Sequence, residues 1–210
     1  MNITRLLFFS LGLLTVLIIF VKSGDDTDKH PLSKEAIILA FGDSLTAGYG
    51  ASRGKGYPAQ LQRLSGIKVI NAGISGEVSA DGLKRLPELL RQYKPQVVIL
   101  CHGGNDILRR KSMHQLQENL RQMILLSQNN GAEVLLVAVP NFGLLGLSAL
   151  SQYEVLADEY KLMFAEDVLS DILGSNQLKS DRIHPNDKGY KVMAERFYEI
   201  LSDEGLLGKL

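Results

Sequence analysis

The stretch Ala36-Ile37-Ile38-Leu39-Ala40-Phe41 is an unbroken apolar run, and Gly42-Asp43-Ser44-Leu45 follows it directly. A short apolar run that ends at a turn residue is typical of a buried β-strand. Two similar runs, Ile67 to Ile70 and Val97 to Cys101, lead into Asn71-Ala72-Gly73 and Gly103-Gly104-Asn105-Asp106. If these strands are parallel, the three polar segments leave the sheet at one edge, where open α/β folds place their sites.

Strand and helix patterns alternate from Lys34 onward, which predicts an α/β domain with a parallel sheet and helices on both faces. We expect the strand order 2-1-3-4-5. The expected strands are residues 36–41, 68–70, 97–101, 133–139 and 161–164. The expected helices are residues 57–65, 80–93 after Ser79, 113–129 after Ser112 as a cap, 148–160 and 167–173, with a last helix that Asn186 or Asp187 opens and that runs to about residue 201.

The composition indicates one globular domain. A chain of 210 residues with 45% hydrophobic content is long enough to bury a sizeable core. Acidic and basic side chains balance at 23 each, so the charge gives no sign of a nucleic-acid partner. The one cysteine, Cys101, lies in a predicted strand and is interpreted as a packing residue.

The N-terminus carries a targeting pattern. Arg5 precedes an uncharged apolar segment from Leu6 to Val21, which as a helix would be about 24 Å long. That length lies between a signal-peptide core and a membrane-spanning helix. Residues 1–23 are therefore predicted to be a signal peptide or an N-terminal membrane anchor, residues 24–34 a polar linker, and residues 35–210 the catalytic domain. We expect that domain on the periplasmic or extracellular side of the cytoplasmic membrane, anchored there or released by cleavage.

Three side chains have the chemistry of a serine hydrolase. A serine hydroxyl is a weak nucleophile and needs a positioned base, so Ser44 alone would more often be a helix cap. His184 lies three residues after Asp181 and just before Pro185. In a tight turn this spacing lets the carboxylate accept a hydrogen bond from imidazole Nδ1–H, which leaves Nε2 free for Ser44. Taken alone, the Asp181–His184 string could equally be a loop carboxylate beside a surface histidine.

Acyl transfer also needs hydrogen-bond donors for the oxyanion of the tetrahedral intermediate. Asn105 offers a side-chain N–H₂, Gly73 offers an unobstructed backbone N–H, and the N–H of Ser44 is the natural third donor. Taken separately, Gly73 and Asn105 could be ordinary turn residues.

Together the four segments, the last being Asp181-Arg182-Ile183-His184, resemble the blocks of the SGNH, or GDSL, hydrolase superfamily over about Ile38 to Tyr198. The tracts that begin at Gly42 and Asn71 are similar to the bacterial acyl-CoA thioesterase I, lysophospholipase and arylesterase group. The resemblance implies a three-layer α/β/α sandwich with a five-stranded sheet and no metal or organic cofactor. It also implies that Ser44 is the nucleophile, His184 the base, Asp181 its orienter, and Gly73 and Asn105 oxyanion donors.

One segment differs from that group. After the fourth predicted strand, residues 141–150 carry several large apolar side chains, among them Phe142, Leu144 and Leu145. These residues could line an acyl-chain groove or touch a membrane, or they could simply pack on the next helix.

The lead hypothesis is a hydrolase of carboxylic esters or thioesters, with acyl esters, acyl-CoA and lysophospholipid as candidate small-molecule substrates. One alternative uses the same residues to remove O-acetyl groups from a polysaccharide, although an acetyl group would need only a small pocket. Another is a metal-dependent phosphoesterase built on Asp43, Asp106, Asp181 and His184, which leaves Ser44, Gly73 and Asn105 without roles. A non-catalytic binding module is the fourth.

Overall fold

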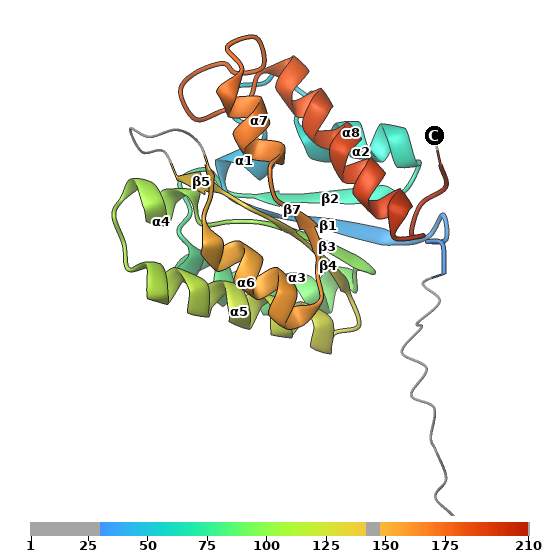
Figure 1. Ribbon diagram of the computed structural model, residues 1–210. Coiled ribbons are helices and arrows are strands. Elements are labelled where there is room, and N and C mark those ends of the chain that lie inside the picture. Colours follow the sequence, from blue (N-terminus) through green and yellow to red (C-terminus); the bar gives the residue numbers. More distant parts are fainter. Residues whose placement is uncertain (1–29, 142–147, 210) are drawn as a thin grey trace, which may run out of the picture.

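The computed structural model describes residues 30–141 and 148–209. Its centre is a five-stranded parallel sheet with the strand order β2-β1-β3-β4-β7 (Figure 1). The strands are β1 (Ile37–Gly42), β2 (Lys68–Gly73), β3 (Val97–Cys101), β4 (Glu133–Val137) and β7 (Met163–Ala165). This arrangement confirms the α/β class, the five parallel strands and the order 2-1-3-4-5 that the sequence predicted.

Helices cover both faces of the sheet, which gives the three layers expected (Figure 1). On one face lie α3 (Ser79–Tyr93), α5 (Met113–Asn129) and α6 (Ser151–Tyr160), and on the other lie α2 (Tyr57–Ser65), α7 (Val168–Gly174) and α8 (Asp187–Asp203). Because both faces are covered, β1, β3 and β4 are almost wholly buried, as their apolar runs indicated.

Local sequence explains where the long helices begin. The side chain of Ser112 accepts a hydrogen bond from Gln115 N–H and caps α5. Asn186 accepts hydrogen bonds from the N–H groups of Lys188 and Gly189 and caps α8. The second of these caps matters for the site, since it fixes the loop that carries His184 against the start of α8.

Several predicted boundaries were wrong. The helix expected over residues 148–160 begins at Ser151, because β5 (Pro140–Asn141) pairs antiparallel with β6 (Ser148–Ala149). β2 runs to Gly73 instead of ending at Ile70, since it pairs with β1 along its full length. A short helix, α4 (Gly104–Leu108), was not predicted at all. Phe142, Leu144 and Leu145 lie outside the described residues.

The start of the described chain is attached to its end. Leu32 N–H donates to the carbonyl of Leu206 at 2.9 Å, and the Leu32 side chain packs partly on the core. Within residues 30–141 and 148–209, no helix is both long and apolar enough to cross a membrane. The apolar segment Leu6 to Val21 lies outside this range.

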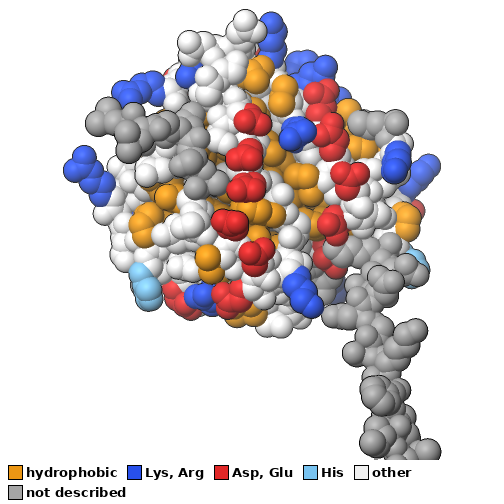
Figure 2. Space-filling model, viewed as in Figure 1, with side chains coloured by type: hydrophobic (Ala, Val, Ile, Leu, Met, Phe, Trp, Pro, Cys, Tyr) orange, Lys and Arg blue, Asp and Glu red, His pale blue; other side chains and the backbone are white. Residues whose placement is uncertain are grey.

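On the face shown in Figure 2, acidic side chains form a column across the middle and basic side chains lie mainly around the margin. Separately, a hollow beside β7 and α8 is lined in part by Glu166, Asp167, Glu199, Asp203 and the basic Arg196. None of the residues predicted to be catalytic lines this hollow.

Candidate active site

The carboxyl edge of the sheet brings the predicted site segments together. Register places Gly42 of β1 beside Gly73 of β2 on one side and Cys101 of β3 on the other. The backbones of β1 and β3 approach closely at Gly42, where a Cβ would lie 2.0 Å from the Cys101 carbonyl oxygen. β1 ends at this glycine and α1 (Ser44–Ala47) begins two residues later, so Ser44 lies at the edge of the sheet.

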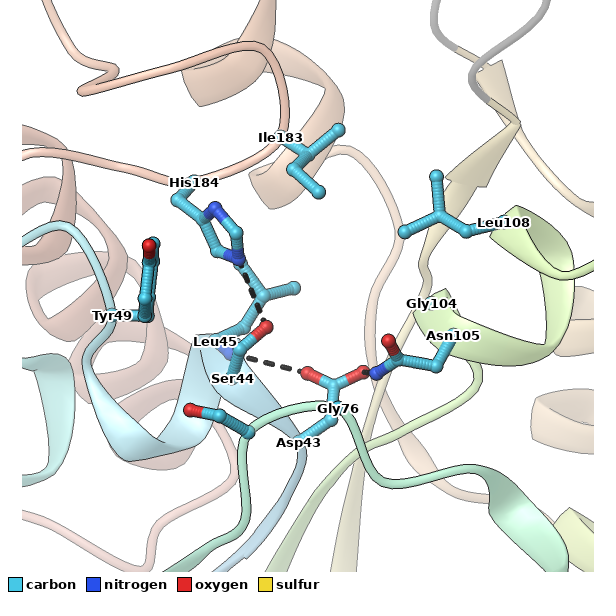
Figure 3. Close-up of a pocket in the computed structure, with 11 residues that line it drawn as sticks. Asp43, Ser44, Leu45, Tyr49, Gly76, Gly104, Asn105, Leu108, Ile183 and His184 are labelled. Atoms are coloured by element: carbon cyan, nitrogen blue, oxygen red, sulfur yellow. Dashed lines mark hydrogen bonds between the residues drawn. The ribbon is translucent and has the colours of Figure 1, made fainter.

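Ser44 is the first residue of α1 (Ser44–Ala47), a single helical turn. Asp43 caps this turn, its Oδ1 accepting a hydrogen bond from Leu45 N–H at 3.1 Å. Ser44 faces a pocket of about 230 Å³ (Figure 3). The pocket is lined by Asp43, Ser44, Leu45, Tyr49, Ser75, Gly76, Gly104, Asn105, Leu108, Ile183 and His184.

His184 approaches Ser44 from the loop before α8. Its Nε2 lies 3.0 Å from Ser44 Oγ, and its Nδ1 lies 2.8 Å from Asp181 Oδ2. The carboxylate can only accept, so Nδ1 carries the proton and the Nε2 lone pair faces the serine hydroxyl. The structure thus places Ser44, His184 and Asp181 in the relative positions of a nucleophile, its base and the group that orients the base.

Asp181 is held by its own turn. Its Oδ1 accepts the backbone N–H groups of Ile183 and His184, both at 2.8 Å. Partial burial opposes ionisation, but these backbone hydrogen bonds and the one from the His184 ring outweigh it and lower the pKa of Asp181. The side chain therefore remains an anion that can stabilise a positive charge on the imidazole.

Tyr49 forms a second contact with the base. Its ring lies against the His184 ring with centroids 4.5 Å apart, while 57% of the residue remains exposed (Figure 3). The backbone of Tyr49 is held by α8, because the Tyr49 carbonyl accepts a hydrogen bond from the Tyr190 hydroxyl at 2.8 Å. This contact limits rotation of the imidazole away from Ser44.

Gly73 does not occupy the position that the sequence suggested. It is the last residue of β2, its N–H donates to Asn71 Oδ1 at 3.0 Å, and it does not line the pocket. A Cβ on Gly73 would lie 2.1 Å from the Ala47 backbone nitrogen, so this glycine serves the close packing of β2 against α1. A strand that ends at Ile70, as the apolar run predicts, would instead leave Gly73 in the loop after it.

Gly76 is the glycine that lines the pocket. It adopts a left-handed backbone conformation with φ 81°, and no hydrogen-bond acceptor for its N–H is found among the described residues. The signal for it lay in the same tract, since Ser75-Gly76 is a turn pair three residues after Gly73.

Asn105 lies in α4 and lines the pocket, as expected. Its Nδ2 donates to Asp43 Oδ2 at 3.2 Å and to the Glu77 carbonyl at 3.0 Å. The amide is thus held on two sides, and the longer bond leads to a carboxylate beside Ser44. A substrate oxyanion would have to share or replace one of these acceptors.

Asp43 is 2% exposed, and burial raises the pKa of its carboxyl group. Hydrogen bonds from Leu45 and Asn105 and the nearby His102 and His184 act in the opposite direction. Since Asp43 caps α1 and also holds Asn105, it links the position of the nucleophile to that of the amide.

The donor set proposed for a metal-dependent phosphoesterase is not gathered in one place. Asp106 accepts hydrogen bonds from Ser79 N–H and Oγ at 2.8 and 2.7 Å and is absent from the pocket lining. Among the described residues, no group of three His, Cys, Asp or Glu side chains could hold a metal ion. The carboxylates instead have local partners, which removes the structural support for that alternative.

Known proteins are similar to this chain in sequence and in fold. Residues 40–192 match the GDSL-like Lipase/Acylhydrolase family. The chain is 39% identical to Esterase TesA of Pseudomonas aeruginosa over 70% of its own length and 79% of that protein. It is 37% identical to Thioesterase 1/protease 1/lysophospholipase L1 of Escherichia coli over 75% of its length and 79% of that protein.

Among solved structures, the psychrotrophic esterase EstA from Pseudoalteromonas sp., inhibited by monoethylphosphonate, superposes with a TM-score of 0.70 at 31% identity. The match covers 80% of this chain and 98% of EstA. With the family match, these similarities establish that the chain belongs to the GDSL-like Lipase/Acylhydrolase family and is an esterase or thioesterase.

Proposed function

We propose that this enzyme hydrolyses carboxylic esters or thioesters of apolar acyl groups through an acyl-enzyme on Ser44. The observation that carries the proposal is the chain of contacts from Ser44 Oγ to His184 Nε2 at 3.0 Å and from His184 Nδ1 to Asp181 Oδ2 at 2.8 Å. Acyl esters, acyl-CoA and lysophospholipid remain the candidate substrates.

In the first half of the reaction, His184 Nε2 takes the hydroxyl proton while Ser44 Oγ attacks the carbonyl carbon. Collapse of the tetrahedral intermediate breaks the bond to the leaving group, and His184 returns the proton to the departing alcohol or thiol. In the second half, His184 takes a proton from water, whose oxygen attacks the acyl carbon. The carboxylic acid leaves, and the proton returns to Ser44.

The oxyanion of each tetrahedral intermediate needs donors on the side of Ser44 away from His184. The N–H groups of Ser44 and Gly76 and the Asn105 amide are the donors that we propose. Gly76 replaces Gly73 in this role, because Gly76 lines the pocket with its N–H free of other described acceptors, whereas the Gly73 N–H is bonded to Asn71.

The pocket wall supports an acyl group in preference to a sugar. Leu45, Tyr49, Leu108 and Ile183 present apolar surface, and in Figure 3 Ile183 and Leu108 lie above Ser44 and Asn105. Leu108 is 46% exposed, which makes it available to a chain that extends out of the pocket. This lining gives the polysaccharide O-acetyl esterase alternative no specific support.

A fluorophosphonate probe tests the assignment of the nucleophile. Wild-type enzyme should be labelled and should hydrolyse p-nitrophenyl esters. Ser44→Ala and His184→Ala should each lose activity by orders of magnitude, and the double variant should lose little more, because the two residues act as a unit.

Ser75 offers a matched control, since it is a second serine in the same pocket with no histidine partner among the described residues. Ser75→Ala should still be labelled, whereas Ser44→Ala should not. Persistent labelling of Ser44→Ala would show that Ser44 is not the nucleophile.

Location is a separate proposal, supported only by the sequence of residues 1–23. We propose that this segment directs the enzyme across the cytoplasmic membrane and either anchors it there or is cleaved. N-terminal sequencing of the protein recovered from membrane and soluble fractions tests this. A full-length enzyme found in the cytoplasmic fraction alone would contradict it.

A further inference from the structure

Next to the pocket wall, the side chains of Glu77, Arg85 and His102 form a largely buried hydrogen-bonded cluster around the Glu77 carboxylate. Arg85 Nε donates to Glu77 Oε1 at 2.7 Å, and Arg85 Nη2 donates to Glu77 Oε2 at 2.6 Å. His102 Nε2 lies 3.1 Å from Glu77 Oε2. The Glu77 side chain is 7% exposed and His102 is fully buried, whereas the Arg85 side chain is 21% exposed, so the carboxylate and the imidazole are shielded from water.

His102 is oriented by a second hydrogen bond. Its Nδ1 accepts the Gly103 backbone N–H at 3.0 Å, so its Nε2 carries the proton that Glu77 accepts. Helix α3 leaves space for this contact at Gly82, where a Cβ would lie 2.5 Å from His102 Nε2 and 3.3 Å from Glu77 Oε2. Because Gly82 has no side chain, His102 has room to form its hydrogen bond with Glu77.

The cluster connects the segments that carry the proposed oxyanion donors. Glu77 follows Gly76 in the chain, and its carbonyl accepts a hydrogen bond from the Asn105 amide at 3.0 Å. Arg85 Nη2 also donates to the carbonyls of Ala72 at 2.8 Å and Gly42 at 3.2 Å, at the ends of β2 and β1. One carboxylate is therefore tied to both loops that meet around Ser44.

We propose that Glu77, held by Arg85 and His102, is a positioning residue that fixes the Gly76 N–H and the Asn105 amide at the separation an oxyanion needs. The inference rests on the proposed function, because it concerns the geometry of the same site. Glu77 itself does not line the pocket, so it acts through these two donors.

The chemistry of the cluster suits a role in positioning the oxyanion donors better than a role in stabilising the fold. A buried ion pair contributes little more to folding than apolar side chains of the same volume, because both charges must be desolvated. A two-point contact between guanidinium and carboxylate does fix distance and direction. His102 adds a third point of attachment from the position directly after β3, in the segment that leads to Asn105.

The test compares His102→Gln and His102→Leu with Glu77→Gln in the full chain. His102→Gln can still donate towards Glu77, whereas His102→Leu cannot. Each variant is measured for kcat and KM on a p-nitrophenyl ester, for Ki against a trifluoromethyl ketone with the same acyl chain, and for Tm. The ketone forms a tetrahedral adduct whose oxyanion occupies the hole, so its Ki reports the donors directly.

Glu77→Gln and His102→Leu should lower kcat by about 10- to 100-fold with KM little changed, since small misplacements at a reacting centre have effects of that size. Ki for the ketone should rise in proportion to the loss in kcat/KM, and His102→Gln should recover much of the loss. Asn119→Ala is the control: it removes a buried hydrogen bond to Ser79 Oγ and should lower Tm without these kinetic effects.

A fall in Tm with unchanged kcat and Ki in Glu77→Gln and His102→Leu would overturn the proposal. Equal kinetic losses in His102→Gln and His102→Leu would overturn the part assigned to the His102 donor. If His102→Leu does not fold, Glu77→Gln and Glu77→Asp decide, the second keeping the charge while moving it by one methylene. A wild-type enzyme that neither reacts with fluorophosphonate nor hydrolyses esters would instead remove the proposed function.

Discussion

Asn105 shows how one side chain serves both the fold and the site. Its amide donates to Asp43 and to the Glu77 carbonyl, and these two bonds fix the side chain beside Ser44. The bond to Asp43 is the longer, at 3.2 Å, and burial raises the pKa of that carboxyl group. A developing oxyanion therefore competes with an acceptor whose negative charge the protein already disfavours.

Asn105→Ala should lower kcat by about 100- to 1,000-fold, the usual result of removing a side-chain donor from an oxyanion hole. KM should change little, because the interaction strengthens only when charge develops on the oxygen. Steady-state kinetics on one ester checks both values. An increase in KM with unchanged kcat would mean that Asn105 binds the substrate in its ground state.

The choice between Gly76 and Gly73 can be settled by a crystal structure of the enzyme phosphonylated on Ser44. The phosphonyl oxygen should lie about 2.7–3.1 Å from the backbone nitrogens of Ser44 and Gly76. The Gly73 N–H should remain bonded to Asn71, as it is here at 3.0 Å. An oxygen bound to Gly73 would restore the sequence-based assignment.

Side chains of the site are easier to recognise in the sequence than backbone donors. The segments containing Ser44, Asp181 and His184 were identified because their side chains carry recognisable chemistry at a recognisable spacing. A backbone N–H has no such signature, and its position depends on where a strand ends. Pairing with β1 extends β2 by three residues beyond Ile70, and this shift alone moved the expected donor from the pocket into the sheet.

Among the elements, α3 has an unusual feature, because Pro87 lies inside it. A proline in a helix interior removes one backbone hydrogen bond and costs about 3 kcal/mol relative to alanine. Pro87 is exposed, so its replacement would remove no buried contact. The same helix carries Gly82 and Arg85, which connects its geometry to the hydrogen-bonded cluster around the Glu77 carboxylate.

Pro87→Ala should stabilise the protein by about 1–3 kcal/mol, the gain being reduced by the greater freedom of alanine in the unfolded chain. Urea unfolding measures the change, and Glu88→Ala, at the next exposed position, is the control for loss of a surface side chain. A decrease in stability would indicate that packing of Leu86 and Leu90 requires the helix shape that Pro87 imposes.

Element prediction succeeded where the pattern is periodic and failed where pairing or turns decide. The helix from Met113 to Asn129, with Ser112 as its cap, and the strand from Val97 to Cys101 have the bounds that the sequence predicts. By contrast, residues 148 and 149 lie in a strand because they pair with Pro140 and Asn141. The local sequence of residues 148 and 149 gives no information about this pairing. The short helix α4 follows from a turn at Gly103, with φ 113°, and has no periodicity to detect.

Two carboxyl groups next to the pocket, those of Glu77 and Asp43, have pKa values that are shifted in opposite directions. Burial raises the pKa of Glu77, but the hydrogen bonds from His102 and Arg85 outweigh it and lower that pKa below its usual 4.5. Burial raises the pKa of Asp43 above its usual 3.8, and its hydrogen bonds do not fully compensate. The site thus combines a carboxylate stabilised as an anion with one that burial disfavours as an anion.

These opposite shifts predict opposite effects of pH on stability. A depressed pKa in the folded state contributes stability above the unfolded value, and that contribution is lost as pH falls through the folded value. The difference in unfolding free energy between wild type and Glu77→Gln should therefore shrink as pH decreases below about 4.5. A raised pKa acts in the other direction, so wild type should lose stability relative to Asp43→Asn as pH rises above about 3.8.

Urea unfolding of wild type, Glu77→Gln and Asp43→Asn at a series of pH values between 3 and 7 checks both signs in one experiment. Both substitutions replace a carboxylate by its amide, and both carboxyl groups are linked to Asn105, Asp43 through its side chain and Glu77 through the neighbouring backbone carbonyl, so each variant serves as the control for the other. The stability differences from wild type should change with pH in opposite directions. Curves that change in the same direction would mean that the charge balance around Glu77 or Asp43 differs from the one deduced from their hydrogen bonds.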